Sequence, residues 1–237
     1  MHSSTPNFQP VILGTEQNPH LINLGVNCSP DENKLFIKIC KEFKDIFSWT
    51  YDELNTFDRK IIQHNIPMKH SAKPYQQNLR KMHPSLEPSI KKELEKLLKV
   101  KFIFLVRHMQ WISNLVPARK KSGEIKLCVD FWNLNRASEK DNYHVPSMEQ
   151  ILQRVLGAEM FSLFDGFSGY NQVLVMTSDQ FKTSFGTPWG TFSYRRIPFG
   201  LFNASVTFQR AIDIAFIGLM QKYVIVYLDD ITIFSKK

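Results

Sequence analysis

Two adjacent carboxylates, Asp229 and Asp230, stand between two runs of β-branched and aromatic residues near the end of the 237-residue chain. Such runs favour strands, and the two-residue gap between them predicts a hairpin turn. Asp-Asp is a poor choice for a tight turn, which prefers Asn-Gly or Asp-Gly because its backbone needs positive φ. Two like charges side by side also repel each other unless a cation lies beside them. The pair is therefore interpreted either as a metal site on a rigid hairpin or as a solvated acidic turn.

A further carboxylate, Asp165, ends a predicted short strand over residues 161–165. If this strand lies beside the hairpin, the carboxylates converge at one end of a sheet. Oxygen ligands suit Mg²⁺, which completes its shell with water and substrate phosphates. Two such ions would clamp the attacking and leaving oxygens of a phosphoryl displacement. The sequence contains no Walker loop, no H-E-x-x-H helix and no G-x-S-x-G elbow, which excludes other common catalytic patterns.

The elements that would position these carboxylates follow from hydrophobic periodicity and turn residues. Residues 1–30 are rich in Pro, Asn, Ser and Gly and predict a linker or flexible arm. The remaining elements are predicted helices in 31–50, from Ser85, from the capping box at Ser147 and after Asn203, and predicted hairpins formed by 111–118 with 125–130 and within 186–197. Their irregular alternation predicts an α+β fold, an antiparallel sheet with helices packed on one face.

The net charge of +8 is concentrated in the middle of the chain. Residues 69–140 contain 16 Lys and Arg against 6 Asp and Glu, whereas the segments before and after them are close to neutral. A basic segment beside an acidic hairpin suggests a polyanion held near a cation-binding centre. A lysine-rich, solvated helix would account for part of the same charge.

Three cysteines, Cys28, Cys40 and Cys128, lack the C-x-x-C spacing of a zinc site and are too few for a disulfide framework. They favour a reducing compartment. The N-terminal residues lack the pattern of a secretory signal, and the longest apolar runs are too short to span a membrane. We expect an intracellular protein, in the cytoplasm, a virus-like particle or the nucleus, without a membrane partner.

Four sequence blocks in a fixed order carry a resemblance to a known family. The blocks are Leu127-Cys-Val-Asp-Phe-Trp-Asn-Leu-Asn135, Phe161-Ser-Leu-Phe-Asp-Gly-Phe-Ser-Gly-Tyr-Asn-Gln172, Ile197-Pro-Phe-Gly-Leu-Phe-Asn-Ala204 and Tyr227-Leu-Asp-Asp230. From about Phe43 onward the chain resembles the reverse transcriptase of gypsy-type long-terminal-repeat retrotransposons, as found in plant genomes. The resemblance implies an RNA-directed DNA polymerase that joins a deoxynucleotide (dNTP) to a primer 3′-hydroxyl on an RNA or DNA template.

The resemblance also implies a domain organisation and a truncation. Residues 1–50 would be a spacer with one amphipathic helix and residues 51–84 an extended connecting segment. Residues 85–237 would form fingers, about 85–139 and 173–203, and a partial palm, about 140–172 and 204–237. The family continues with the rest of the palm, thumb, connection and RNase H, and usually an integrase. We therefore expect a polyprotein fragment that is inactive when expressed alone.

The roles implied for single residues are those of a two-metal polymerase. Asp165 and Asp229 would hold two Mg²⁺ ions, or Mn²⁺, with Asp230 completing the cluster. The primer-facing residues would be Tyr227 and Leu228. The nucleotide-binding residues would be Lys120, Lys121 and Lys126 at the triphosphate, Tyr170 against the sugar as a barrier to a 2′-hydroxyl, and Phe199 and Gly200 in the pocket wall.

Three positions depart from the family pattern. Lys126 and Trp132 each stand where arginine is usual, and His144 stands where proline is common. Lysine keeps the charge but loses the bidentate geometry of arginine. These departures leave a second interpretation open, a catalytically inactive remnant of a decayed element with weak nucleic-acid binding.

Overall fold

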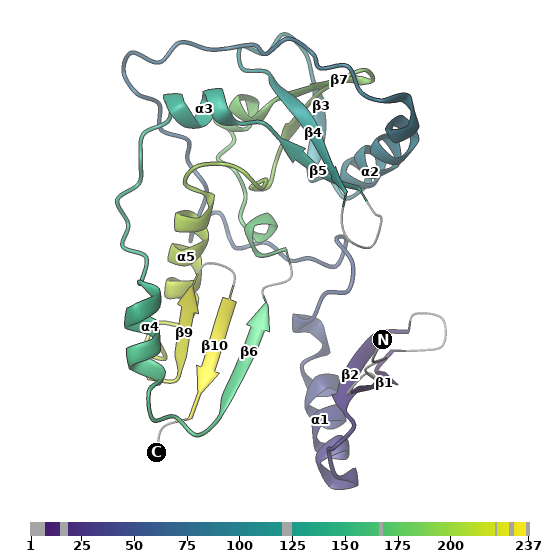
Figure 1. Ribbon diagram of the computed structural model, residues 1–237, viewed down its shortest axis with the longest axis vertical. Coiled ribbons are helices and arrows are strands. Elements are labelled where there is room, and N and C mark those ends of the chain that lie inside the picture. Colours follow the sequence, from purple (N-terminus) through teal and green to yellow (C-terminus); the bar gives the residue numbers. More distant parts are fainter. Residues whose placement is uncertain are drawn as a thin grey trace, which may run out of the picture. The chain divides into compact units, whose positions relative to one another are not determined.

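The computed structural model describes residues 8–14, 19–119, 125–165, 168–220, 222–227 and 230–235, without the side chain of Asp165 (Figure 1). The chain forms two compact units, Met1–Leu54 and Asn55–Lys237. Within the described residues, every helix falls short of the length and hydrophobicity that a membrane crossing requires.

The smaller unit combines a hairpin with a helix, formed by β1 (Phe8–Ile12), β2 (Leu21–Gly25), α1 (Pro30–Glu42) and the short 3₁₀ helix Lys44–Ile46. The prediction of a linker is wrong for the described part of residues 1–30, because β1 and β2 pair in antiparallel fashion. The predicted helix is confirmed and ends earlier than expected. Its start is fixed by a capping box in which Glu32 N donates to Ser29 Oγ and Ser29 N donates to the Glu32 carboxylate.

The larger unit contains two sheets with helices around them. Its helices are α2 (Glu87–Lys99), α3 (Trp132–Ala137), α4 (Met148–Val155) and α5 (Ala204–Ala215), with 3₁₀ turns η2 (Pro84–Leu86), η3 (Gly169–Gln172) and η4 (Gln180–Thr183). Its strands are β3 (Ile103–Val106), β4 (Ser113–Arg119), β5 (Ile125–Val129), β6 (Phe161–Asp165), β7 (Phe185–Thr187), β8 (Gly190–Tyr194), β9 (Val224–Tyr227) and β10 (Asp230–Phe234). The mixture of sheets and helices confirms the α+β class.

The five-stranded sheet has the order β3-β8-β7-β4-β5. The predicted hairpins are present as β4 with β5 and β7 with β8. The pairing of β4 with β7 is parallel, so this sheet is mixed and not purely antiparallel. Helix α2 buries Ile90, Leu94 and Leu97 at the spacing that the sequence predicted.

The three-stranded sheet has the order β6-β10-β9 and is antiparallel throughout (Figure 1). Helix α4 packs on it through a small core in which Ile151 meets Ile225 and Phe234. Helix α5 lies against β9, where the buried Gln209 donates from Nε2 to the carbonyl of Val226 at 3.3 Å. Helices α4 and α5 therefore hold the β9–β10 hairpin, whose second strand begins at Asp230.

The extended segment after residue 55 is fastened to the larger unit by hydrogen bonds. His64 N donates to the carbonyl of Leu174, and Ile66 N donates to the buried carboxylate of Asp179 at 2.7 Å. Lys182 Nζ donates both to that carboxylate and to the carbonyl of Ile66, each at 2.8 Å. The division into connecting segment, fingers and palm stays a prediction.

In the larger unit, strand β3 and helix α3 were not predicted, and one helix cap differs from the prediction. Strand β3 and helix α3 are short, so neither spans enough residues to show a clear period. Asn203 does precede α5, but its side chain makes no cap hydrogen bond to that helix. It accepts a hydrogen bond from Asp141 N at 3.1 Å instead, because tertiary contacts compete with local capping.

The buried imidazole of His64 makes stability depend on pH. Its side chain is 1% exposed and shares a 2.8 Å hydrogen bond with the Thr207 hydroxyl. Burial lowers the pKa of His64 to about 4, although the charges of Asp179 and Asp141 oppose the shift. The unfolded chain takes up this proton near pH 6.5, so lowering the pH from 6.5 towards 4 favours unfolding.

We expect the free energy of unfolding to fall by about 3 kcal/mol between pH 6.5 and 4, since one pKa unit corresponds to about 1.4 kcal/mol. Urea denaturation at a series of pH values measures this loss. In the His64→Gln variant, the free energy of unfolding should lack this dependence on pH. The control variant His70→Gln, a change at an exposed histidine, should keep it. If the free energy of unfolding changed equally with pH in the parent and in His64→Gln, the effect could not be assigned to His64.

Candidate functional site

The register of the three-stranded sheet brings the ends of β6 and β10 together. Asp165 is the Cα partner of Asp230, and Asp230 is also the partner of Tyr227 across the β9–β10 hairpin. The predicted convergence of Asp165 with Asp230 is therefore present in the backbone. Strand β10 begins at Asp230, so Asp230 lies in the strand, which differs from the turn expected at this residue.

The donor set at this sheet end is chemically suited to a hard cation. Asp230 is exposed, and like charges directly opposite each other destabilise a sheet. Asp229 adjoins Asp230 in the sequence but lies outside the described residues, as do Lys120, Lys121 and Leu228. Among the side chains that the structure describes, no three His, Cys, Asp or Glu gather as a metal site. Carboxylate oxygens are nevertheless the ligands that Mg²⁺ prefers.

Four of the predicted nucleotide-binding residues lie in connected parts of the larger unit. The ring of Phe199 lies edge-on to that of Tyr170, with centroids 5.5 Å apart, and Lys126 Nζ lies 3.5 Å from the Phe199 centroid. Gly200 follows with φ of +96°, a conformation that favours glycine. The backbone of Gly200 is held by Asn135, whose Nδ2 donates to its carbonyl at 2.7 Å.

Tyr227 is half-buried and packs against the core of Ile151, Ile225 and Phe234. Its predicted contact with a primer stays a prediction.

The turn that carries Tyr170 is held by residues to which the sequence analysis gave no role at the site. Phe208 of α5 packs edge-on to Tyr170 at 5.5 Å, and Arg196 donates to the carbonyl of Asn171 at 3.1 Å. Arg196 also lies over the ring of Phe102, and burial lowers the pKa of its guanidinium. The signal available for Phe208 was only its place on the apolar face of a predicted helix.

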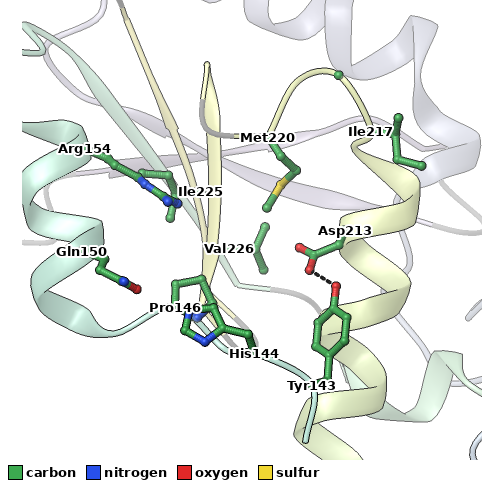
Figure 2. A pocket seen from close by; sticks show the side chains of 11 residues that line it. Tyr143, His144, Pro146, Gln150, Arg154, Asp213, Ile217, Met220, Ile225 and Val226 are labelled. Atoms are coloured by element: carbon green, nitrogen blue, oxygen red, sulfur yellow. Dashed lines mark hydrogen bonds between the residues drawn. The ribbon is translucent and has the colours of Figure 1, made fainter.

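A pocket of about 490 Å³ lies beside β9, between α4 and α5 (Figure 2). The Tyr143 hydroxyl donates to the Asp213 carboxylate. The pKa of Tyr143 is raised to about 12, mainly by burial and in second place by this hydrogen bond. Asp213 also accepts from Gln209 Nε2 at 3.0 Å. His144, one of the departures from the family pattern, lies in the wall of this pocket, which the sequence analysis did not predict.

Asp165 and Asp230 are partners at the end of an antiparallel sheet, an arrangement that suits metal-dependent phosphoryl transfer. The family model described as reverse transcriptase (RNA-dependent DNA polymerase) matches residues 118–237, half of the chain. The chain belongs to this family, as the sequence blocks predicted.

Relatives and solved structures agree with this assignment. The chain is 40% identical over 111 residues to the Pol polyprotein from transposon gypsy of Drosophila melanogaster, covering 47% of the chain and 11% of that protein. It is 29% identical over 201 residues to the Pol polyprotein from transposon 412 of the same species, covering 82% and 16%. The chain thus spans less than a fifth of these curated relatives.

The fold resembles foamy viral protease-reverse transcriptases. The form in complex with double-stranded DNA has a TM-score of 0.77 and 19% identity, and covers 89% of this chain and 36% of that one. The complex with an RNA/DNA hybrid has a TM-score of 0.71 and 18% identity, with 93% and 31% covered. At this level of identity the likeness concerns the fold alone.

Gly169 allows Phe208 to pack beneath the turn of Tyr170. A Cβ at position 169 would lie 2.5 Å from Cζ of the Phe208 ring, closer than packed atoms approach. We expect Gly169→Ala to lower the free energy of unfolding by about 1–3 kcal/mol through overpacking, as measured by urea denaturation.

The matched control is Gly186→Ala, since a Cβ at Gly186 would meet its nearest neighbours at 3.5 Å, an ordinary contact. That variant should stay within about 0.5 kcal/mol of the parent. Equal stability of the two variants would show that the ring of Phe208 moves aside freely.

Proposed function

We propose that the chain is the catalytic part of an RNA-directed DNA polymerase, which extends a primer 3′-hydroxyl with deoxynucleotides on an RNA or DNA template. The observation that supports this most is the register that sets Asp165 opposite Asp230 at the end of the three-stranded sheet. Neighbouring Asp229 would add its carboxylate to the same end of the sheet. Membership of the reverse transcriptase family supports the same reaction.

The carboxylates would hold the divalent ions of the reaction. Asp165 and Asp229 are the proposed ligands of two Mg²⁺ ions, with Asp230 completing the negative cluster. Bound Mg²⁺ supplies positive charge that offsets the charge developing on the transferred phosphoryl group. The fixed sheet holds the carboxylates in place, so little reorganisation is needed when that charge develops.

Lysines and aromatic rings would position the incoming nucleotide. Lys126, which lies over the ring of Phe199, would neutralise the triphosphate together with Lys120 or Lys121. Tyr170 lies edge-on to both Phe199 and Phe208, and these contacts restrict its ring. A ring held in that way would leave too little room for a 2′-hydroxyl beside the sugar, and Gly200 would let the backbone approach the nucleotide.

A nucleic-acid partner is supported by charge and by structural relatives. Residues 69–140 contain 16 Lys and Arg against 6 Asp and Glu, and such a segment attracts phosphate backbones. The foamy viral neighbours are described in complex with double-stranded DNA and with an RNA/DNA hybrid. The proposed partners are therefore a primed template and a dNTP.

Replacing each of Asp165, Asp229 and Asp230 by Asn, singly, should reduce Mg²⁺-dependent primer extension by roughly a hundredfold or more. The assay uses the chain joined to the downstream part of the transposon 412 Pol polyprotein, because a polymerase must also grip its duplex. Primer–template binding should change little, because the lost electrostatic stabilisation acts mainly in the transition state.

Asp45→Asn is the control, since Asp45 is exposed in the smaller unit. Near-parental extension by Asp229→Asn would overturn the catalytic assignment. A parent that binds primed template without extending it would support the inactive-remnant interpretation instead.

Sugar selection provides an independent test in the same joined chain. Tyr170→Val removes the ring that packs against Phe199 and Phe208, so ribonucleotide incorporation should rise while deoxynucleotide use falls but stays measurable. Tyr170→Phe keeps the ring and should discriminate like the parent. Competition between labelled ribonucleotides and deoxynucleotides measures the ratio, and an unchanged ratio in Tyr170→Val would place the sugar barrier elsewhere.

A further inference from the structure

Helix α1 of the smaller unit presents an apolar face to solvent. This face carries Leu35, Phe36 and Ile39 of the helix and its C-cap residue Phe43, each between 43% and 56% exposed. The four residues recur at i, i+1, i+4 and i+8, a spacing that places them on one side of a helix. Together they are called the α1 stripe.

The contacts of α1 with its own unit come from another side of the helix. Asn33, Ile37 and Cys40, spaced i, i+4 and i+7, are half-buried. Asn33 also donates from Nδ2 to the carbonyl of Cys28 at 3.5 Å. In α1, which the structure describes in full, no residue is buried. The stripe is therefore available for a contact that the helix does not use to pack on its unit.

The apolar surface continues beyond the end of the helix. Ile46, in the 3₁₀ helix Lys44–Ile46, is 68% exposed, and Phe47 is 41% exposed. Contiguous apolar side chains of this kind mark interaction sites on soluble proteins. A helical stripe of them fits a second helix, whose side chains fill the grooves between its own.

Charged residues along one edge of the stripe indicate which helix fits. Lys38 and Glu42 lie one turn apart on this edge. Lys34 pairs with Asp31 at 3.3 Å, whereas neither Lys38 nor Glu42 has an ion-pair partner among the residues that the structure describes. The charges of Lys38 and Glu42 are therefore available to a partner.

A second copy of α1, packed in antiparallel fashion, complements these charges. When a two-fold axis relates two such helices, the same edges of both adjoin. An axis beside residue 40 sets Lys38 of each copy against Glu42 of the other. The same axis sets Ile39 near its own counterpart and Phe36 near Phe43 of the other copy. One alignment thus satisfies both the charged and the apolar residues.

We propose that the α1 stripe binds a second copy of this chain, forming an antiparallel helix pair with two-fold symmetry. The 13 residues of α1 span only about 20 Å, so the pair is smaller than the roughly 1,200–2,000 Å² of a stable interface. We therefore expect a weak dimer, with a dissociation constant of roughly 10–100 µM. The contact goes beyond the proposed polymerase reaction and uses none of its residues.

Sedimentation velocity of the 237-residue chain at about 1–200 µM brackets this constant and tests the pair. The parent should shift from monomer towards dimer. Ile39→Asp puts a charge at the centre of the pair and should leave the chain monomeric. Lys38→Glu should raise the dissociation constant about three- to tenfold, because it removes both ion pairs and opposes like charges. Adding Glu42→Lys to Lys38→Glu should restore it to within about twofold, because the pairs form again with reversed sign.

Ile61→Asp is the matched control and should dimerise like the parent, because Ile61 is 55% exposed and lies in the larger unit. Circular dichroism melting establishes that each variant is folded. A parent that stays monomeric at the highest concentration, or a double variant that associates no better than Lys38→Glu, would overturn the helix pair. The assay contains no template and no dNTP, so its failure would leave the primer-extension test of the proposed function standing.

Discussion

The pairing of β6 with β10 is the constraint on which the proposed chemistry depends. Because side chains alternate across a strand, a slip of one residue would turn Asp230 to the opposite face and separate it from Asp165. Opposed carboxylates do not favour this register by themselves. Apolar packing supplies the preference, since Ile151 of α4 meets Ile225 and Phe234 on the two strands of the hairpin. The core therefore holds charges together that would otherwise move apart.

The proposed nucleotide site likewise depends on packing from several elements. The turn of Tyr170 comes after β6 in the chain and is fixed from α5 by Phe208 and, through Asn171, by Arg196, which lies two residues past the end of β8. Lys126 comes from β5, in the same sheet as β8. A turn, a helix and a strand of the five-stranded sheet thus contribute to one cluster of rings and cations.

Local patterns predicted the elements well where they were long and periodic, as for α2 with Ile90, Leu94 and Leu97. The meeting of Asp165 with Asp230 was predictable because strand ends and hairpins leave few arrangements. The smaller unit's hairpin was missed because its residues show no clear alternation. The exposure of the α1 stripe was not predictable either, since periodicity identifies an apolar face of a helix but not whether tertiary contacts cover it.

The order of strands in the five-stranded sheet bears on how the protein is made. β3 and β4 leave the ribosome early, but their partners β8 and β7 are translated much later. Such non-local pairing slows folding, because a long loop must close before any hydrogen bond forms. At about 5–20 residues per second, synthesis leaves both strands with open edges for several seconds. During that interval the nascent chain is exposed to wrong pairing with its neighbours on a polysome, and its yield should depend on chaperones that cover these edges.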